Sequence, residues 1–329
     1  MNPSGKDIDD PQEIKATDAQ ASLFMEEGIR LLQSKNDADA AILYFDCALE
    51  LRRRLPIGMP MHAYGLAACW LNRAEALTRL GPTEHAQTLQ AYDEALALLR
   101  SLPLADDVRF SKRLAIAHQN RALVLAAQKP PATMEAITSL HDAVAALDHA
   151  GAMDATERDH LLAVVWMNLA NIQSLEDTLP SNLDAREAAR RTLALVKAYE
   201  HQDVAAAEAG LKARHVLCRI AARRLSAHPE NEVDIADVHD ATDLADEGLD
   251  LVREWEQGGV DRFRGLASDL FRFGVRVYAY YQPHFLDQFI SEQLDPERFG
   301  PPYLQSTEMQ DAARDIILLL TSLRPEGRE

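Results

Sequence analysis

The sequence contains few aromatic residues, few cysteines and no long apolar run. Aromatic residues make up 6% of the 329 positions, and the three cysteines cannot all pair with one another. No window approaches the roughly 18 uninterrupted apolar residues that indicate a transmembrane helix, and the first residues lack the cationic start and apolar run of a signal peptide. Free thiols without a targeting segment are typical of a reducing compartment, so we expect a soluble, cytoplasmic protein.

Basic residues are also scarce relative to acidic ones. The chain has 34 lysines and arginines against 52 aspartates and glutamates, which gives a formal net charge of −18. A surface of this sign repels nucleic acids and anionic lipids over most of its area, so any anionic partner would need a local reversal of charge. We therefore expect neither general nucleic-acid binding nor membrane binding.

What the sequence does contain is a repeated helical pattern. Trp70, His118 and Trp166 follow one another at intervals of 48 residues. Four positions after each of them stands a small residue, and further copies continue this small position in both directions: Gly28, Ala74, Ala122, Ala170, Cys218 and Gly274. Turn residues divide each unit into two helices, which should each contain about 20 residues and span about 30 Å.

The pattern resembles the tetratricopeptide repeat, in which two antiparallel helices approach closely at small residues; Ala41, Phe45 and Ala48 match its second helix best. The resemblance implies an all-α, right-handed superhelical solenoid of about six antiparallel hairpins over residues 17–295. We expect a disordered acidic leader before it (1–16), and after it (296–329) a loop, a C-terminal capping helix and a short tail. The unit exceeds the family's usual length of about 34 residues, which leaves the curvature open.

The resemblance also implies that the first helix of each hairpin lines a concave groove. The positions expected there are mostly apolar in the first four hairpins and form a cationic stripe in the fifth. The predicted groove site comprises Gln119, Leu123, Met167, Asn171, Lys212, His215, Arg219 and Arg223. Arginines at helical spacing can present paired donors to a carboxylate, so we expect a protein or peptide partner with acidic residues or a free C-terminus. The alternative is that these cations pair with acidic neighbours such as Asp240, Asp243 and Glu247.

A second candidate surface is an aromatic cluster near the C-terminus. The chain has 9 Phe and 8 Tyr residues, and ten of these 17 lie in the segment from Phe263 to Tyr303, where arginines stand between them. This composition is typical of interface hot spots, although beside a capping helix it also suits a core. The predicted interface comprises Phe271, Arg272, Arg276, Tyr278, Tyr280 and Tyr281, and a homodimer through this end is its simplest use.

The sequence has no phosphate-binding glycine-rich loop and no HExxH, GxSxG or CxxC motif. We therefore expect no cofactor and no metal site, and we predict a non-enzymatic scaffold or adaptor. One alternative is a ligand-gated regulatory module, in which a small peptide or an anionic metabolite controls an effector. A more remote one is a helical ribonuclease, because Arg113 and His118 match the Arg-x4-His spacing of HEPN-type enzymes. His118 occupies the position of Trp70 and Trp166, which favours a packed core histidine.

Overall fold

Every regular element in the described part of the chain is helical. The computed structural model describes residues 8–151, 153–176, 178–227, 235–297 and 300–322, and over these ranges it contains no strand. The predicted all-α fold is therefore confirmed. Among the helices of these ranges, none is both long enough and apolar enough to cross a membrane.

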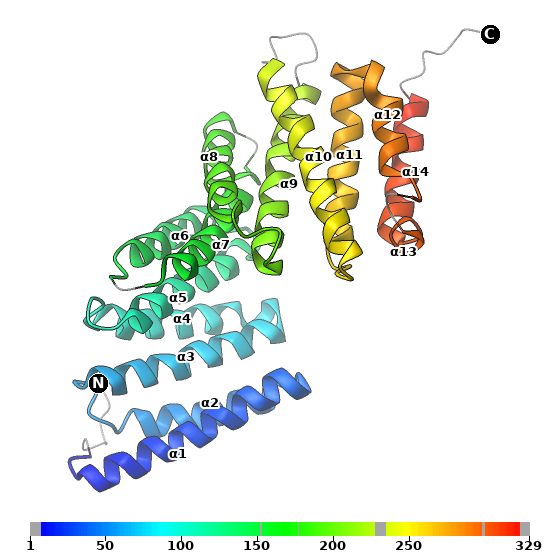
Figure 1. Ribbon diagram of the computed structural model, residues 1–329. Helices are drawn as coiled ribbons and strands as arrows, with labels where there is room; N and C mark the ends of the chain where they lie inside the picture. Colours follow the sequence, from blue (N-terminus) through cyan, green and yellow to red (C-terminus); the bar gives the residue numbers. More distant parts are fainter. Residues whose placement is uncertain (1–7, 152, 177, 228–234, 298–299, 323–329) are drawn as a thin grey trace. The chain divides into compact units, whose positions relative to one another are not determined.

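The helices form two compact units, one ending at Arg158 and the other beginning at Asp159, so the array predicted over 17–295 is divided. The first unit is a stack of three consecutive hairpins (Figure 1). Its helices are α1 (Pro11–Arg30), α2 (Ala38–Arg52), α3 (Pro60–Leu80), α4 (His85–Arg100), α5 (Val108–Ala126) and α6 (Thr133–Asp148). Two of its hairpin turns contain Asn36 and Gly81, whose φ angles of 52° and 107° end the preceding helix.

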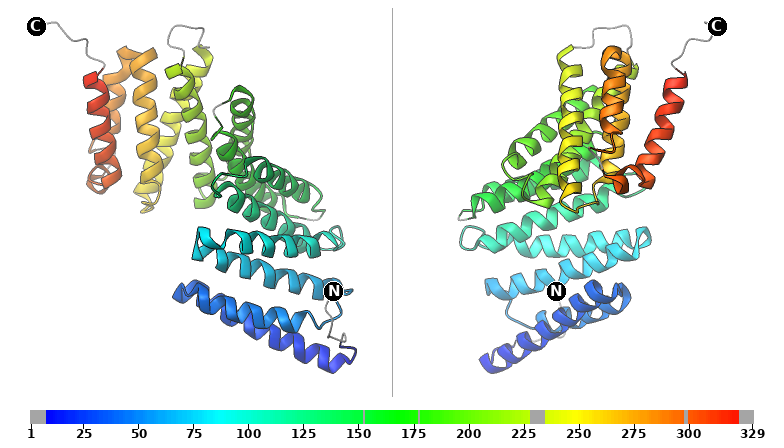
Figure 2. Two further views of the ribbon diagram at one scale, coloured as in Figure 1. Left: turned by 180° about the vertical axis from the view of Figure 1, so that it is seen from behind. Right: turned by 45° about the vertical axis from the view of Figure 1, so that its right-hand side comes forward.

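The second unit continues the same pattern of consecutive helices (Figures 1 and 2). Its helices are α7 (Ala155–Gln173, whose first turn contains the boundary), α8 (Leu179–Val196), α9 (Val204–Ala227), α10 (Ile235–Gln257), α11 (Arg264–Tyr281), α12 (Pro283–Gln293), α13 (Pro301–Leu304) and α14 (Thr307–Ser322). Each unit is thus built from successive helices that pair into hairpins, and the second unit ends, within the described ranges, with α14.

The small residues of the repeat stand where two helices of a hairpin touch. A methyl group added at Gly28 would lie 2.5 Å from Phe45 Cε1 on α2, and one added at Gly274 would lie 2.5 Å from Phe289 Cζ on α12. The first and sixth hairpins therefore use the same contact, in which an aromatic ring of the second helix rests on a glycine of the first. At the equivalent positions in other hairpins Ala74, Ala122 and Ala170 are fully buried.

The N-terminal helix begins earlier than the sequence indicated. Helix α1 starts at Pro11, and the Asp10 carboxylate accepts a hydrogen bond from the Gln12 amide at 3.1 Å. Ile8 is also buried, and its amide donates to the Arg54 carbonyl. The prediction of a disordered leader was therefore wrong for residues 11–16, because an aspartate cap followed by proline at the first helical position favours helix initiation. Residues 1–7 lie outside the described ranges.

The terminal helix α14 covers the end of the second unit's core with one face only. Met309, Ala312 and Ile316 are buried in the same apolar cluster as Phe271 of α11. On its other side Ile317 and Leu318 are each 64% exposed. A terminal repeat usually turns a polar face outward, so these two aliphatic side chains are unusual for a cap.

Candidate functional site

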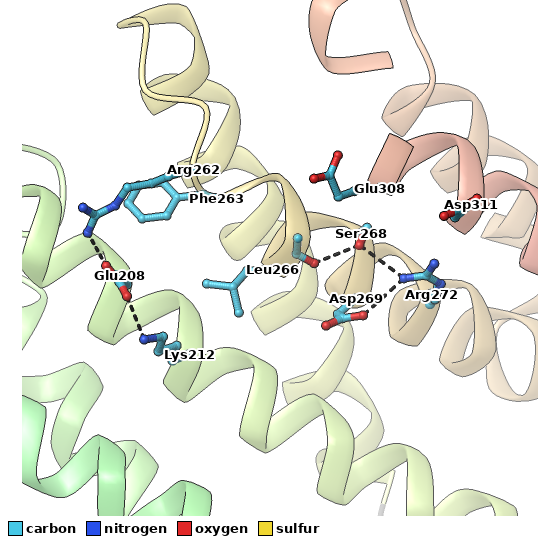
Figure 3. A pocket seen from close by; sticks show the side chains of 11 residues that line it. Glu208, Lys212, Arg262, Phe263, Leu266, Ser268, Asp269, Arg272, Glu308 and Asp311 are labelled. Carbon is cyan, nitrogen blue, oxygen red and sulfur yellow. Dashed lines mark hydrogen bonds and ion pairs between the residues drawn. The ribbon is translucent and has the colours of Figure 1, made fainter. Parts of the chain in front are cut away.

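A groove in the second unit runs between α11 and α14 and consists of two adjoining cavities that share Arg272. The wider cavity, about 770 Å³, is also bordered by α9 and by the turn before α11 (Figure 3). Its lining residues are Glu208, Lys212, Arg262, Phe263, Gly265, Leu266, Ser268, Asp269, Arg272, Glu308 and Asp311. The narrower cavity, about 390 Å³, is lined by Arg272, Arg276, Asp315, Ile316, Leu318 and Leu319. We call the two cavities together the α11–α14 groove.

Helical periodicity places these side chains along the groove. Ser268, Arg272 and Arg276 are spaced by four residues and therefore lie on one face of α11. On α14 the lining positions run from Glu308 to Leu319 in the same order, so the two helices are parallel. From Gly265 to Arg276 the groove is about 17 Å long at the α-helical rise.

Arg272 holds the two walls of the groove together. Its Nε donates to Asp315 Oδ2 on α14 at 3.0 Å, while Nη1 donates to Ser268 Oγ and to Asp269 Oδ1 on its own helix, both at 3.2 Å. The guanidinium group is thus fixed in the middle of the groove between neighbours of opposite charge. It separates a wide polar end from a narrow end with aliphatic walls.

The wide end is electrically balanced rather than cationic. Glu208 accepts hydrogen bonds from Lys212 Nζ at 2.7 Å and from Arg262 Nη2 on the α10–α11 turn (Figure 3). Burial alone would raise the pKa of Glu208, but the hydrogen bonds and positive charges of Lys212 and Arg262 outweigh it and lower that pKa. Lys212 is therefore neutralised by a carboxylate on its own helix.

His215 contributes no strong positive charge to this region. Its Nε2 lies 3.6 Å from Asp269 Oδ2, and its ring packs against Phe273 with 5.5 Å between centroids. Burial lowers the pKa of His215; Asp269 opposes this effect and Arg219 adds to it. The imidazole is accordingly neutral near pH 7 and serves as a packing and hydrogen-bonding group.

The remaining members of the predicted cationic stripe bind the end of α7. Arg219 Nη2 donates to Asn171 Oδ1 at 3.3 Å and to Ser174 Oγ, and Arg223 Nη1 donates to the Ser174 carbonyl at 2.6 Å. Carbonyls at a helix C-terminus lack intrahelical partners, so Arg223 satisfies one of them. The prediction of a continuous cationic stripe facing a partner was wrong, because the four side chains turn to three different neighbours.

The alternative prediction was that Lys212, Arg219 and Arg223 pair with acidic neighbours such as Asp240, Asp243 and Glu247; of the three, only Lys212 has an ion pair with a carboxylate among the described residues, and its partner is none of these. Asp240 accepts a hydrogen bond from Arg190, and Glu247 accepts one from Arg214, an arginine that the sequence analysis did not single out. Glu208 is the carboxylate that neutralises Lys212.

The other predicted groove residues do not join this site. Met167 is buried, with 8% of its surface exposed, so it belongs to the core rather than to a groove floor. Gln119 and Leu123 lie on α5 of the first unit; Gln119 is half-buried and Leu123 is 43% exposed.

The predicted C-terminal interface separates into core and surface residues. Phe271 is fully buried against Phe289, so its assignment to an interface was wrong. Tyr278 stacks on Phe289 at 4.6 Å between centroids, and its hydroxyl donates to Asp246 Oδ2 at 2.9 Å. Tyr281 is half-buried, whereas Tyr280 is 53% exposed. Arg272 and Arg276 line the α11–α14 groove.

The α14 side of the groove escaped the sequence analysis. Glu308, Asp311, Asp315 and Leu318 follow one another at intervals of three or four residues, which was a usable signal that they share one face of a helix. Nothing in the sequence indicated which other helix this face would meet. Within the described residues no group of three or more His, Cys, Asp or Glu side chains could hold a metal ion.

Arg113 and His118 of the first unit contact different helices. Arg113 Nη2 lies 3.4 Å from the Tyr64 hydroxyl of α3. The His118 ring is almost fully buried, with Nδ1 3.3 Å from Ser139 Oγ on α6 and Nε2 3.4 Å from Arg100 Nη2 on α4. The two side chains therefore do not converge on one point, and His118 has the surroundings of a core histidine.

The burial of His118 leads to a prediction about pH. Burial lowers its pKa to about 4, while Asp142 raises it and Arg100 and Arg121 lower it further. An unfolded histidine takes up a proton near pH 6.5, whereas the folded one resists down to about 4, so falling pH favours the unfolded state. We expect His118 to cost about 2 kcal/mol of stability between pH 7 and pH 4.5.

Urea unfolding followed by circular dichroism at these two pH values measures the effect. The His118→Phe variant should lose less stability on acidification than the wild type, whereas the exposed control His149→Phe should behave like the wild type. Equal pH dependence in wild type and His118→Phe would contradict the prediction.

No protein-family model matches this sequence, and no curated protein matches it. Solved structures do resemble it. The S. pombe nuclear import adaptor Nro1 aligns with a TM-score of 0.57 and 13% identity, covering 94% of this chain and 99% of Nro1. BtubC from P. vanneervenii aligns with a TM-score of 0.50 and 15% identity, covering 96% of this chain and 95% of BtubC. At this level of identity the likeness shows the shared helical fold alone.

Proposed function

We propose that this protein is a non-catalytic adaptor that binds a segment of another protein in the α11–α14 groove. The observation that carries the proposal is the groove itself: two parallel helices border a channel about 17 Å long, with paired charges at one end and aliphatic walls at the other. Such a channel fits an extended peptide or a short helix. Nro1, whose fold is similar, is a nuclear import adaptor, which supports the adaptor role by analogy.

The charges of the groove indicate where a carboxylate of the segment would bind. Lys212 and Arg262 already bind Glu208, and Arg272 binds Asp269 and Asp315. Arg276 is exposed and makes no ion pair or hydrogen bond within the described ranges. It lines the narrow cavity together with Leu318 and Leu319. The segment therefore carries an aliphatic residue close to an acidic residue or a free C-terminus.

Reversing the charge of Arg276 tests the proposal. A library of random 12-residue peptides displayed on phage is selected on the wild-type protein, and the selected peptides should combine aliphatic and acidic residues. Arg276→Glu should weaken their binding by about 10-fold or more, since a hydrogen bond to a charged group contributes about 1.5–3 kcal/mol. Fluorescence anisotropy of labelled peptides gives the dissociation constants.

The matched control is Lys197→Glu, which reverses another exposed cation of the second unit that lines neither cavity of the groove. It should leave peptide binding within about twofold of the wild type. Selected peptides that bind the Arg276→Glu variant as tightly as the wild type would overturn the groove proposal.

A further inference from the structure

One position of the repeat differs between hairpins. Intervals of 48 residues lead from Trp70 to His118, Trp166 and Arg214, each of which stands four residues before a small residue of the repeat. The two tryptophans are half-buried, whereas His118 and Arg214 are almost fully buried. Each of these two polar side chains lines a cavity, of about 590 Å³ at His118 and about 910 Å³ at Arg214. The same repeat position thus carries an indole ring in two hairpins and borders a cavity in two others.

The second hairpin shows how the chain surrounds an indole at this position. The guanidinium carbons of Arg53 and Arg73 lie 5.1 Å and 5.9 Å from the centre of the Trp70 ring. Arg73 is fixed there, because its Nε donates to Asp46 Oδ1 at 2.7 Å. Guanidinium groups within about 6 Å of a ring centre are attracted to the negative face of the aromatic system. Two arginines, one of them held by an aspartate, therefore stabilise this indole.

The third hairpin repeats the two arginines and the aspartate around His118. Arg100 and Arg121 occupy the repeat positions of the two arginines at Trp70, 47 and 48 residues further along the chain. Arg121 Nε donates to Asp93 Oδ1 at 2.8 Å, so the hydrogen bond recurs between the same atoms. All three residues line the cavity of about 590 Å³. The side chains that surround an indole in the second hairpin therefore surround a smaller ring and a cavity in the third.

The bottom of this cavity contains hydrogen-bond acceptors. Ser139 Oγ donates to the His118 carbonyl at 2.9 Å and so accepts from Nδ1–H of the imidazole, at 3.3 Å. Burial lowers the pKa of His118 to about 4, which leaves the ring neutral and Nε2 an acceptor. Arg100 Nη2 lies 3.4 Å from both Nε2 and Asp142 Oδ2, which is long for a hydrogen bond. A ligand with an N–H or O–H donor can replace one of these long contacts with a shorter hydrogen bond.

The charges that line the cavity favour a neutral ligand. The charged lining residues are Arg100, Arg121, Asp93, Glu135 and Asp142. Three carboxylates repel a further anion, and two guanidinium groups repel a further cation. Leu96 adds a buried apolar wall, and Met134, which is 66% exposed, adds an apolar rim. A neutral aromatic ring with one polar hydrogen at its edge matches this lining.

We propose that the cavity over His118 binds the tryptophan side chain of a partner protein. The face of the indole lies against Arg100 and Arg121, as the chain's own indole does in the second hairpin. The indole N–H donates to Asp142 or to His118 Nε2, and the ring edge packs on Met134. Tryptophans that fill pockets of this kind are common anchors of protein interfaces. All of these residues belong to the first unit, so the inference is independent of the α11–α14 groove.

The mouth of the cavity and the chain's own tryptophans indicate the source of the ring. Arg100 and Met134 are exposed, the Arg100 side chain by 57%, so the backbone of a partner can stay outside while one side chain enters. A second copy of this chain is a poor source. Its three tryptophans, Trp70, Trp166 and Trp255, are all half-buried and none is exposed. The ring therefore comes from a different protein.

Fluorine NMR with a synthetic peptide tests the inference. The peptide has nine residues, with 5-fluorotryptophan at its centre between glycines and serines, and its line width is followed as full-length protein is added. It should bind with a dissociation constant of about 1 mM, as expected for a single aromatic anchor. Arg100→Ala removes one guanidinium group from the ring face and should weaken binding about 3- to 10-fold. Arg53→Ala, which removes the equivalent arginine beside the chain's own Trp70, is the matched control and should stay within about twofold of the wild type.

A second variant fills the cavity from within. His118→Trp places an indole where Trp70 and Trp166 stand in their hairpins, and it should weaken peptide binding about 10-fold or more. Thermal unfolding checks that each variant is folded. Because the Arg100 side chain is largely exposed, Arg100→Ala decides the test even if His118→Trp does not fold.

Four results would overturn the inference. Three of them are equal binding by Arg100→Ala and Arg53→Ala, retained binding by a folded His118→Trp, and displacement of the fluorinated peptide by its leucine analogue. The fourth is binding of free N-acetyltryptophanamide without binding of the peptide, which would assign the cavity to small indole compounds instead of a partner protein. Arg276→Glu should leave binding of this peptide unchanged, because Arg276 belongs to the second unit.

Discussion

Replacement of Glu200 by leucine is expected to destabilise the second unit by about 3–5 kcal/mol. Glu200 follows α8 and binds Arg214 of α9 through two hydrogen bonds, Nη1 to Oε2 at 2.7 Å and Nη2 to Oε1 at 2.9 Å. The two side chains are only 6% and 8% exposed. Without the carboxylate a buried guanidinium group would lose its principal counter-charge, which costs far more than the pair contributes to stability.

The surroundings of the pair explain why relaxation would recover little of this cost. A methyl group at Gly210 would lie 2.6 Å from Glu200 Oε2, so the glycine provides the space in which the pair forms. The Arg214 Nε atom is buried without a hydrogen-bond partner. Glu247 also accepts a hydrogen bond from Arg214, at 3.4 Å, but its side chain is 62% exposed and compensates weakly.

Urea unfolding monitored by circular dichroism measures the effect, with two controls. The double variant Glu200→Leu/Arg214→Leu should recover most of the lost stability, because removal of both charges leaves no unpaired ion in the core. Glu254→Gln, which removes an exposed carboxylate bound to His201, should change stability by less than about 0.5 kcal/mol. A single variant as stable as the wild type would show that Arg214 is not held by Glu200.

Replacement of Gly28 by leucine is expected to destabilise the first unit by about 3 kcal/mol. The first carbon of the new side chain would already lie 2.5 Å from Phe45 Cε1, and the Phe45 side chain is fully buried. Replacing glycine raises helix propensity by about 1 kcal/mol, which does not offset the steric overlap between the leucine side chain on α1 and the Phe45 ring on α2. Helices α1 and α2 would have to separate.

Thermal unfolding of the Gly28→Leu variant tests this contact. Gly265→Leu is the matched control, because a methyl group added at Gly265 of α11 would have no atom within 4 Å; the stability of this variant should differ from that of the wild type by less than about 1 kcal/mol. The second-site change Phe45→Leu should restore part of the stability of Gly28→Leu, since the smaller side chain relieves the overlap. Additive effects of the two substitutions would argue against the direct contact.

The sequence by itself determined the helices and their pairing into hairpins. The spacing of small residues from Gly28 to Gly274 predicted where helices approach, and residues such as Asn36 and Gly81 marked the turns between them. These features are local: helical periodicity and turn chemistry act over a few residues and leave a direct trace in the sequence. Even so, Asp10 and Pro11 contained a helix start that the polar composition of the N-terminus concealed.

Only the tertiary structure decided which charges are satisfied and which remain available. Lys212, His215, Arg219 and Arg223 share a helical face in the sequence, yet their partners come from three places: their own helix, α11 and the end of α7. Arg276 and Leu318 line the same cavity, although helices α12 and α13 separate them in the sequence. Such pairings depend on the register between helices and on side-chain rotamers, which helical periodicity does not encode.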